Sequence, residues 1–561
     1  MTRLTGIINK YSIFFILLFP LFYYFTGIYF RLILEDPSLR SIDPDYVYFM
    51  SGLNISEGYF KVKHIDHPGS PLQYLMAIVF RTIWLFRKNP AGFTEDILSY
   101  SDLYLAIVNL TITAIIAVSL FVAGKYVYKK SGSVFYGMLI QTLPFISVIL
   151  YEIIGRIIPE LLMPLPMLAL STFLIGYISD KKEKFSNTDL LLLALIMAFG
   201  LSLKLTLISL WIIPLIIVRS LWKKFFVLVT GILFFLMISI PVTLQLERFW
   251  QWTKDLFWHS GQYGSGEETI VDLNNLKENF TQILQIQKHF TYLTIALILL
   301  IPPAIIRFKK QKLSNGNKII SVSFAVVATI LIQIVISGKH YAPRYFLPAL
   351  MLLPVIIFLL AEILKSFYPS KIMKVIVMAG IAFFLVWNIK QQPGVINYTS
   401  EAFDKQIAAR KQTRNIAETF EQRGIKIIVS QDYGCPFPEY ALHFSTVWSA
   451  AALRDKYVEK LAELYPNTYQ YTTWDGKFIY WDTPFNPEKI IEDNIPVYLY
   501  LEKNTNELYE KTIDKLKEIT EKTFSVQKKL LFENHVNGEG LLQLIFTDQS
   551  TTEEKPEKQI P

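Results

Sequence analysis

Cysteine is almost absent from the 561-residue sequence, since Cys435 is the only one. A single cysteine can form neither a disulfide within the chain nor a cysteine-based metal cluster. Charge is also scarce: Asp, Glu, Lys and Arg make up 18% of the residues, against about 25% in soluble proteins. The formal charge of +8 comes from short basic clusters between apolar runs. That pattern is typical of cytoplasmic loops and argues against a nucleic-acid partner.

Long apolar runs are abundant. Hydrophobic residues make up 52% of the chain, aromatic residues 15%, and the mean hydropathy is +0.34, as in polytopic membrane proteins. The runs lie near residues 11–34, 103–123, 133–151, 159–178, 189–219, 225–246, 291–306, 319–337, 346–364 and 372–389. Most are close to the ~20 residues that a spanning helix needs. The first is too long for a signal-peptide core, so we expect it to stay as an anchor.

The run at 189–219 is too long for one span, and Ser202, Lys204 and Thr206 interrupt it. Basic clusters on both sides predict a hairpin of two short helices. With the N-terminus in the cytoplasm, every basic loop then lies inside, as the positive-inside rule requires. This scheme predicts about eleven transmembrane helices. The expected cytoplasmic loops contain residues 125–130, 181–184, 219–224, 307–312 and 365–374.

The first external loop is expected at residues 35–102. It contains an apolar stretch at 72–86 that is short and is broken by Arg81. A full span there would invert every later loop and place the basic clusters outside. We therefore expect a helix that lies on the membrane surface or dips into it.

The composition becomes polar near residue 391, and residues 425–430 have the apolar pattern of a buried strand. The sequence therefore predicts two domains. A helical transmembrane domain occupies residues 1–390, and an extracytoplasmic α/β domain occupies residues 391–561. The expected location is the plasma membrane.

Three carboxylates at the expected outer surface are candidate catalytic residues. Asp43 and Asp45 lie in the first external loop, where an Asp-Pro turn that starts a surface helix would also explain them. Glu160 follows Pro159 in a short external link. An acid there favours the helix dipole, but a carboxylate at the start of a span is also a functional candidate. We expect these acids to converge on one pocket.

Five basic side chains share the expected outer face with the acids: His67, Arg156, Lys204, His340 and Arg344. Each one alone is typical of a residue that caps a helix or reaches from an apolar stem to the membrane surface. Together they suit an anionic ligand dissolved in the membrane, such as a lipid phosphate. The acids are also candidate oxygen ligands for a divalent metal ion. No other cofactor is indicated.

The order of these motifs resembles that of the GT-C superfamily of polytopic glycosyltransferases, which includes the protein O-mannosyltransferases and the aminoarabinose transferase that modifies lipid A. The resemblance covers roughly residues 10–350. The matching motifs are the acidic turn at 43–45, the His-Pro-Gly-Ser-Pro-Leu turn at 67–72, Glu160, the Gly-Leu-Ser-Leu-Lys-Leu-Thr segment at 200–206 and Arg-Tyr-Phe-Leu-Pro at 344–348.

This resemblance implies a transferase that moves a sugar from a polyprenyl-phosphate donor to a hydroxyl of a glycan, lipid or protein at the outer face. It implies an aspartate of the first loop as general base, which is Asp43 or Asp45 because Asp-Pro-Asp replaces the adjacent acids of relatives. Direct attack by the acceptor would invert the anomeric centre. The other matching positions are Glu160 for the second acid, His67 before the proline turn, and Lys204 and Arg344 for the donor phosphate.

Two other functions fit the same composition. A non-catalytic flippase or exporter of lipid-linked glycans would use the cations along a substrate path. However, the ionisable residues lie near helix ends and no inverted repeat is visible. A polymerase or ligase for lipid-linked glycans shares the expected topology. It would release a polyprenyl diphosphate in place of a monophosphate.

Overall fold

The computed structural model describes most of the chain. The described residues are 11–34, 36–87, 92–180, 184–259, 264–269, 273–311, 315–339, 342–420, 424–431, 434–473, 476–480, 484–521 and 524–548. The chain forms two compact units. The first comprises Met1–Leu32, Tyr59–Met76 and Ile107–Thr399, and the second comprises Ile33–Gly58, Ala77–Ala106 and Ser400–Pro561. The second unit thus joins two segments from the first third of the chain, residues 33–58 and 77–106, to the C-terminal region.

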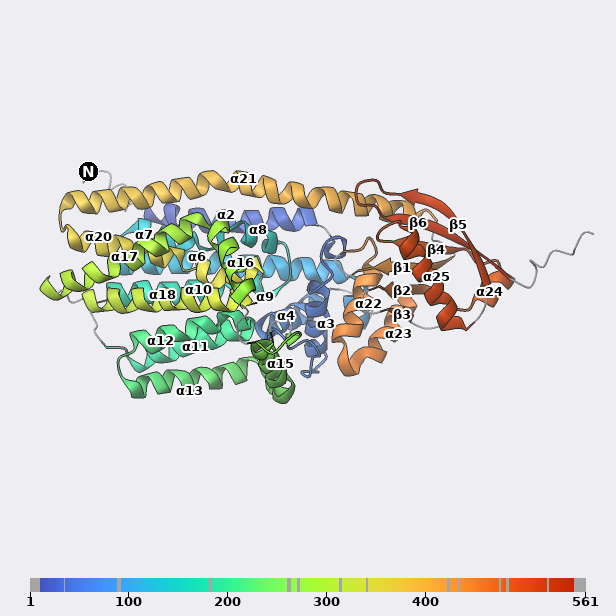
Figure 1. Ribbon diagram of the computed structural model, residues 1–561, viewed down its shortest axis with the longest axis horizontal. Coiled ribbons are helices and arrows are strands. Elements are labelled where there is room, and N and C mark those ends of the chain that lie inside the picture. The colour runs from blue at the N-terminus through green and yellow to red at the C-terminus, as the bar shows by residue number, and fades with distance from the viewer. Residues whose placement is uncertain are drawn as a thin grey trace, which may run out of the picture. The chain divides into compact units, whose positions relative to one another are not determined.

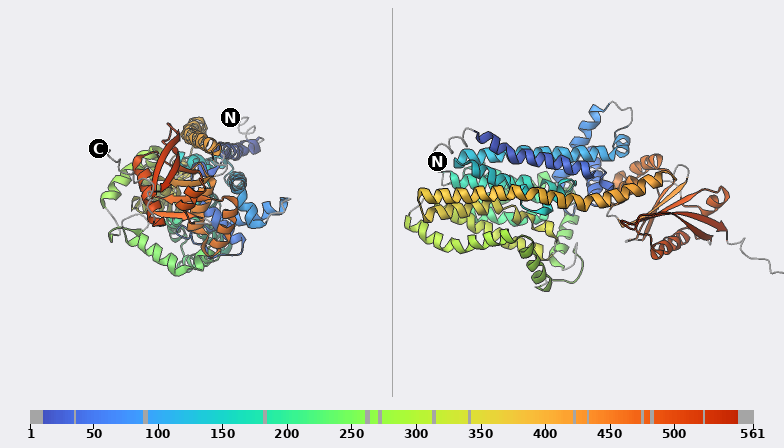
Figure 2. Two further views of the ribbon diagram at one scale, coloured as in Figure 1. Left: turned by 90° about the vertical axis from the view of Figure 1, so that its right-hand side faces the viewer. Right: turned by 90° about the horizontal axis from the view of Figure 1, so that it is seen from above.

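Apolar helices run side by side through the first unit (Figures 1 and 2). Eight helices in the described part are long and apolar enough to cross a membrane. They are α2 (Ser12–Leu34), α6 (Ser101–Ser131), α9 with α10 (Pro159–Leu162, Pro164–Ser179), α13 (Leu221–Ile238), α17 (Lys288–Gln311), α18 (Gly316–Lys339), η5 with α19 and α20 (Pro343–Phe346, Leu347–Leu350, Leu353–Phe367) and α21 (Lys371–Glu418). The prediction of a polytopic helical membrane protein is confirmed.

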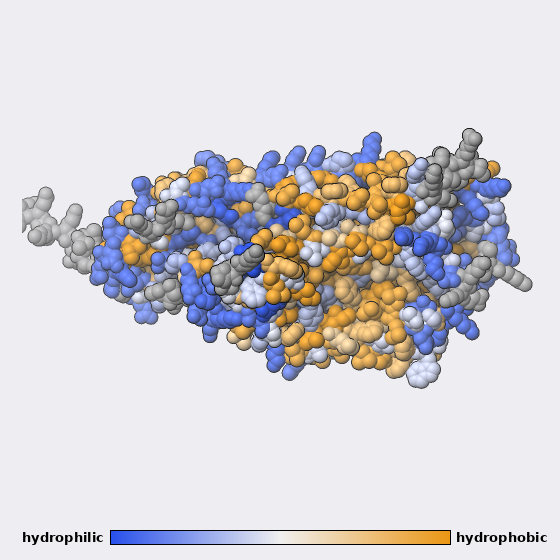
Figure 3. Space-filling model, turned by 180° about the vertical axis from the view of Figure 1, so that it is seen from behind, coloured by the Kyte–Doolittle hydropathy of each residue, from blue (hydrophilic) through white to orange (hydrophobic). Residues whose placement is uncertain are grey.

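Apolar side chains also cover the outside of these helices. Figure 3 shows them gathered over the helices on the face that it draws, with hydrophilic residues toward the helix ends. Phe14, Leu32, Trp222 and Met237 are among the large apolar side chains that are mostly exposed. In water such a surface would be unstable, whereas lipid tails solvate it at no cost.

The expected hairpin is present as two short apolar helices. α11 (Asn187–Leu203) begins with a capping box between Ser186 and Asp189. The chain then becomes extended at Lys204 and continues as η3 (Leu205–Trp211) and α12 (Ile212–Ile217). The polar interruption in the sequence thus marks the point where the helix ends.

Shorter helices complete the first unit. The apolar run at 133–151 is interrupted by a short turn around Pro144. It forms α7 (Val134–Gln141), η2 (Leu143–Phe145) and α8 (Val148–Ile154). The stretch expected to form a surface helix is α4 (Ser70–Phe86), which belongs to the first unit up to Met76 and to the second unit from Ala77. The remaining short helices are α14 (Ile240–Thr243), α15 (Leu246–Trp258) and α16 (Leu273–Ile286).

Basic loops lie together at one end of the first unit. Lys130, near the end of α6, pairs with Asp180 at the end of α10 (Nζ–Oδ2 3.1 Å). Lys318, at the start of α18, donates to the carbonyl of Asp180 (2.7 Å). Arg307, near the end of α17, donates to the carbonyl of Ser366 at the end of α20 (3.3 Å). Loops that the positive-inside rule assigns to one side are therefore close in space.

A six-stranded sheet forms the core of the second unit, in the order β3-β2-β1-β4-β6-β5. β1 pairs in parallel with both β2 and β4, and the other pairs are antiparallel. The strands are β1 (Ile425–Ser430), β2 (Thr468–Thr472), β3 (Lys477–Tyr480), β4 (Val497–Leu501), β5 (Phe524–Glu533) and β6 (Gly540–Asp548). The predicted C-terminal α/β fold is confirmed.

Helices cover both faces of this sheet (Figures 1 and 2). One face packs on apolar residues of α24 and α25, and the other faces α22. The helices are α22 (Pro438–Ser449), α23 (Arg454–Leu464), α24 (Pro487–Glu492) and α25 (Asn506–Thr520).

Part of the first loop packs on α22. The loop contributes η1 (Pro37–Leu39), α3 (Asp45–Ser56) and, further along, α5 (Phe93–Ser99). The amide of Asn54 donates to the carbonyl of Ser449 (2.7 Å), and the hydroxyls of Ser51 and Ser449 are 2.9 Å apart. These contacts explain why residues far apart in the sequence form one compact unit.

Candidate functional site

Glu160 is the centre of a buried charged cluster in the first unit. Pro159 occupies the first position of α9, so Glu160 lies in the first helical turn. The turn before it is held from α6, because Asn109 Nδ2 donates to the carbonyls of Ile154 and Arg156 (both 3.1 Å). Only 3% of the Glu160 side chain is exposed. A carboxylate at this depth requires cationic or hydrogen-bonding partners.

Two cations supply them. Lys204, whose side chain is also 3% exposed, forms an ion pair and a hydrogen bond with Glu160 Oε1. The Nε atom of Arg344 is 3.6 Å from the same oxygen, and its side chain is 37% exposed. Two positive charges therefore face one negative charge, and Arg344 is the member of the cluster that is open to a ligand.

The segment that carries Arg344 is anchored to neighbouring helices. Gln333, fully buried in α18, donates from Nε2 to the carbonyl of Tyr345 (2.6 Å). Its Oε1 accepts a hydrogen bond from Ser209 of η3 (2.5 Å). α18, η3 and η5 are thus joined through one amide. Because η3 follows Lys204 directly, the same amide constrains both cations.

Aromatic rings and a histidine border the cations. The Tyr345 ring centre is 4.9 Å from Lys204 Nζ, which allows a cation–π interaction. The ring of His67 packs edge-on against Trp252 of α15 (centroids 5.6 Å) and near Tyr345 (6.4 Å). Burial, and then the charge of Lys204, lower the pKa of His67 well below its ordinary value. His67 is therefore neutral at physiological pH.

The proline turn holds His67 in place. Gly69 has φ +57°, a left-handed conformation that favours glycine. Its N–H donates to the carbonyl of Leu203 (3.2 Å), the residue before Lys204. The turn at 67–72 is thereby fixed to the end of α11.

The structure gathers four of the predicted site residues: Glu160, His67, Lys204 and Arg344. Arg156 is half-buried in the link before Glu160, and its charge acts on Lys204. His340 lies outside the described residues.

The two aspartates of the first loop belong to the second unit and differ in exposure. Asp45 is 1% exposed in the first turn of α3, and it accepts a hydrogen bond from Ser41 Oγ (2.8 Å). Asp43, two residues earlier, is exposed. Of these two aspartates, Asp43 is therefore the one whose side chain is open to solvent.

A second charged cluster in this unit was not predicted. The guanidinium of Arg414, near the end of α21, pairs with Asp36. The hydroxyl of Tyr46 donates to Asp102 (2.9 Å), while Asp36 accepts from the N–H of Ser38 (2.8 Å). Burial, and then the nearby carboxylates, raise the pKa of Tyr46 well above its ordinary value, so it stays a proton donor. No local pattern signals this cluster, because Arg414 is 378 residues from Asp36 in the sequence.

The described residues contain no group of three or more His, Cys, Asp or Glu side chains placed to hold a metal ion. Asp43, Asp45 and Glu160 thus form no such group.

Comparison with known proteins finds similarity among solved structures alone. No family model and no curated protein matches the chain. A crystal structure of ArnT from Cupriavidus metallidurans bound to undecaprenyl phosphate is 11% identical, with a TM-score of 0.45. The match covers 92% of this chain and 96% of that one. The apo ArnT structure is 10% identical with a TM-score of 0.49, covering 93% and 97% respectively.

Proposed function

We propose that this membrane protein transfers a sugar from a polyprenyl-phosphate donor to an acceptor hydroxyl at the outer face of the membrane. The observation that carries the proposal is the buried carboxylate of Glu160 between Lys204 and Arg344. A single carboxylate between two cations leaves a net positive site among the apolar helices. A lipid-linked phosphate is the anion that such a site would meet most often.

Charge balance explains why the acid is present. A lone lysine buried as deeply as Lys204 would lose several kcal/mol of solvation, and it would tend to lose its proton. Glu160 keeps Lys204 charged before the donor arrives. Arg344 then adds a planar group that can bind two phosphate oxygens at once. Neutral His67 adds a hydrogen-bonding group to the site. Because it carries no charge, its burial does not add the desolvation cost of a further ion.

The reaction needs little covalent chemistry from the protein. The sugar leaves with the phosphate, and the two cations stabilise the negative charge that grows there. The acceptor oxygen attacks the anomeric carbon from the opposite side, so the configuration inverts, and its proton passes to a general base. We assign this role to Asp43, because its side chain is exposed whereas that of Asp45 is buried.

The charge pattern supports the outer face as the location of the cluster. Lys318 lies at the end of α18 where the basic loops meet, and Gln333 is 15 residues further along the helix. At 1.5 Å per residue that separation is about 22 Å, most of the thickness of a bilayer. If the basic loops are cytoplasmic, the cluster opens to the outside.

A donor screen with purified protein in lipid nanodiscs tests the proposal. Polyprenyl-phosphate pentoses and hexoses are offered with a mixed glycan, lipid and peptide acceptor pool, and freed polyprenyl phosphate is measured by mass spectrometry. We expect turnover of at least one donor. Asp43→Asn should lower the rate by about 10²-fold or more, as expected for loss of a general base. The Asp45→Asn variant should keep most of the turnover rate.

Asp404→Asn, an exposed aspartate on α21, is the matched control and should leave turnover unchanged. Equal loss in the Asp43 and Asp45 variants would contradict the assignment of the base. Tight binding of polyprenyl phosphate with no turnover of any donor would refute the transferase and favour the transport alternative.

A further inference from the structure

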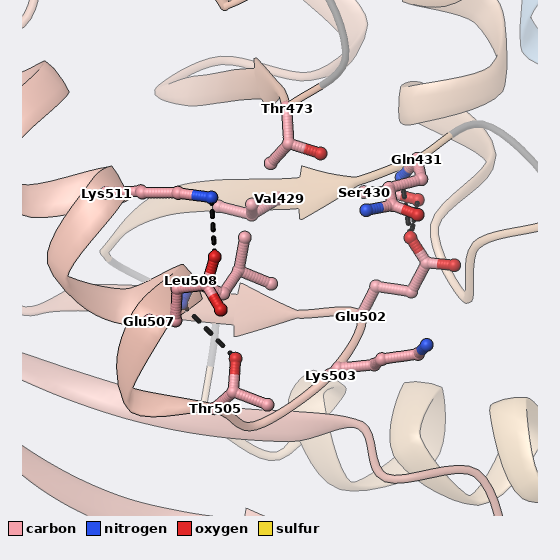
Figure 4. Close-up of a pocket in the computed structure, with 10 residues that line it drawn as sticks. All are labelled: Val429, Ser430, Gln431, Thr473, Glu502, Lys503, Thr505, Glu507, Leu508 and Lys511. Atoms are coloured by element: carbon pink, nitrogen blue, oxygen red, sulfur yellow. Dashed lines mark hydrogen bonds and ion pairs between the residues drawn. The ribbon is translucent and has the colours of Figure 1, made fainter.

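The second unit contains a pocket of about 240 Å³ at one edge of its sheet (Figure 4). The pocket lies where β1 and β4 end and α25 begins. Val429, Ser430 and Gln431 line it from β1, Glu502 from the end of β4, and Thr473 from beyond β2. At about 30 Å³ per water molecule, the space equals that of roughly eight waters.

The topology of the sheet creates this pocket. β1 has parallel neighbours on both sides, and the helices that follow β1 and β4 cover opposite faces. Lys426 of β1 pairs with Glu439 of α22 (2.8 Å). The next residue, Ile427, points to the other face and packs in the cluster that includes Ile513 of α25. A crevice forms outside the carboxyl ends of such strands, where the connections diverge, and α/β proteins bind ligands there.

The lining is polar and its charges balance. Two lysines, Lys503 and Lys511, face two carboxylates, Glu502 and Glu507. Lys511 pairs with Glu507 (2.7 Å), so this pair brings no net charge to the pocket. A ligand with a strong charge of either sign would find as much repulsion as attraction.

Fixed acceptors and hydroxyl groups surround the space. Glu502 accepts hydrogen bonds from the N–H of Gln431 (2.6 Å) and from Ser430 Oγ (3.3 Å), so its carboxylate is held at the strand ends. The Oγ1 atom of Thr473 is buried and has no hydrogen-bond partner within the described ranges. Figure 4 shows the hydroxyls of Thr473 and Thr505 on opposite sides of the strand ends.

We propose that this pocket binds one neutral sugar ring of the acceptor glycan. The ring hydroxyls would donate to Glu502 and accept from Thr473 and the lysines. This inference rests on the proposed transferase function, because it names a glycan as the acceptor. It assigns the C-terminal sheet to acceptor recognition.

Equilibrium binding of methyl glycosides to the full chain in nanodiscs tests the inference. Neutral methyl hexosides, a methyl uronide and an amino-sugar glycoside are compared by saturation-transfer NMR, without any donor. We expect a neutral hexoside to bind at least tenfold more tightly than either charged sugar. Glu502→Gln and Thr473→Val should each weaken binding by about threefold to tenfold, as loss of one hydrogen bond does.

Glu518→Gln is the matched control, because Glu518 lies on α25 outside the pocket and pairs with Lys515 on the surface. The Glu518→Gln variant should bind the neutral hexoside with the same affinity as the unmodified chain. The Thr473→Val side chain keeps the shape of threonine, so binding by this variant as tight as that of the unmodified chain would overturn the inference. Preference for a charged sugar would overturn it as well. Sugar binding without donor turnover would leave this site standing and refute the transferase. Donor turnover without binding of any sugar would support the transferase and refute this sugar site.

Discussion

Glu160 and Lys204 are the residues whose chemistry depends most on each other. Both side chains are almost fully buried, so Lys204 is tolerable at that depth because of Glu160, and Glu160 because of Lys204 and Arg344. Removal of Lys204 leaves Glu160 with Arg344, whereas removal of both Glu160 and Lys204 leaves an apolar contact. Stability and ligand binding can therefore be separated by mutation at this pair.

We predict that Lys204→Met lowers the free energy of unfolding by about 3 kcal/mol, because it leaves the buried Glu160 carboxylate with the more distant Arg344 as its remaining cationic partner in the cluster. The double variant Glu160→Met with Lys204→Met should recover most of that loss but should not bind polyprenyl phosphate. Thermal unfolding in nanodiscs and native mass spectrometry measure the two effects. Lys130→Met, at a half-exposed ion pair, is the control and should change stability by less than about 1 kcal/mol. Full binding by the double variant would rule out the cluster as the phosphate site.

His443 makes the stability of the second unit depend on pH. Burial in α22 lowers its pKa to about 4, below about 6.5 in the unfolded chain. Between these values the unfolded chain binds a proton that the folded chain does not, so stability falls as the pH falls. The expected loss is about 1.4 kcal/mol per pH unit, or about 3 kcal/mol over the whole interval.

His443→Gln should therefore lose less stability than the unmodified chain between pH 7 and pH 5. The thermal midpoint of each protein is measured at both pH values. Subtracting the pH-induced shift of the variant from that of the unmodified chain cancels the contribution of the other titrating groups. An identical pH dependence would mean that folding does not change the pKa of His443, and it would contradict the prediction.

At the scale of elements, the site depends on how three segments are joined. Gln333 links α18 to η3 and to η5, and the last two carry or adjoin the cations. The break of the long apolar run at Lys204 was predictable from its length and polar residues. The contact of the following segment, η3, with the Gln333 amide of α18 was not predictable, because no local sequence pattern distinguishes Gln333.

We predict that Gln333→Leu weakens binding of polyprenyl phosphate by about tenfold, because the Tyr345 carbonyl and the Ser209 hydroxyl lose a partner in a dry site. Thr329→Val is the matched control: Thr329 lies one turn earlier, and its hydroxyl bonds to its own helix at Ala325 (2.8 Å). Affinity measured by native mass spectrometry should change in the first variant alone. Equal affinities would show that Gln333 does not position the cations.

At the scale of the whole molecule, introduced cysteines test the proposed sidedness. Cys435 is fully buried, and burial raises the pKa of its thiol well above the ordinary value, so it should react slowly with maleimides. We predict that Lys489→Cys, in the second unit, is labelled by a membrane-impermeant maleimide in intact cells. Lys310→Cys, among the basic loops, should be labelled only after lysis. The reverse pattern would place the charged cluster inside and contradict the proposed function.

Apolar run length and basic clusters were enough to predict eight of the about eleven expected spans, the hairpin and the buried strand at 425–430, because these depend on neighbours within about twenty residues. β5 and β6 were missed, since their pairing is set by the rest of the sheet. The sequence predicted that Glu160, Lys204 and Arg344 share the outer surface, but it did not predict the contacts between them. Their contacts, the burial of Asp45 and the pairing of Arg414 with Asp36 depend on segments 44 to 378 residues apart. Such pairs are selected by packing and desolvation in the folded chain, which no local pattern records.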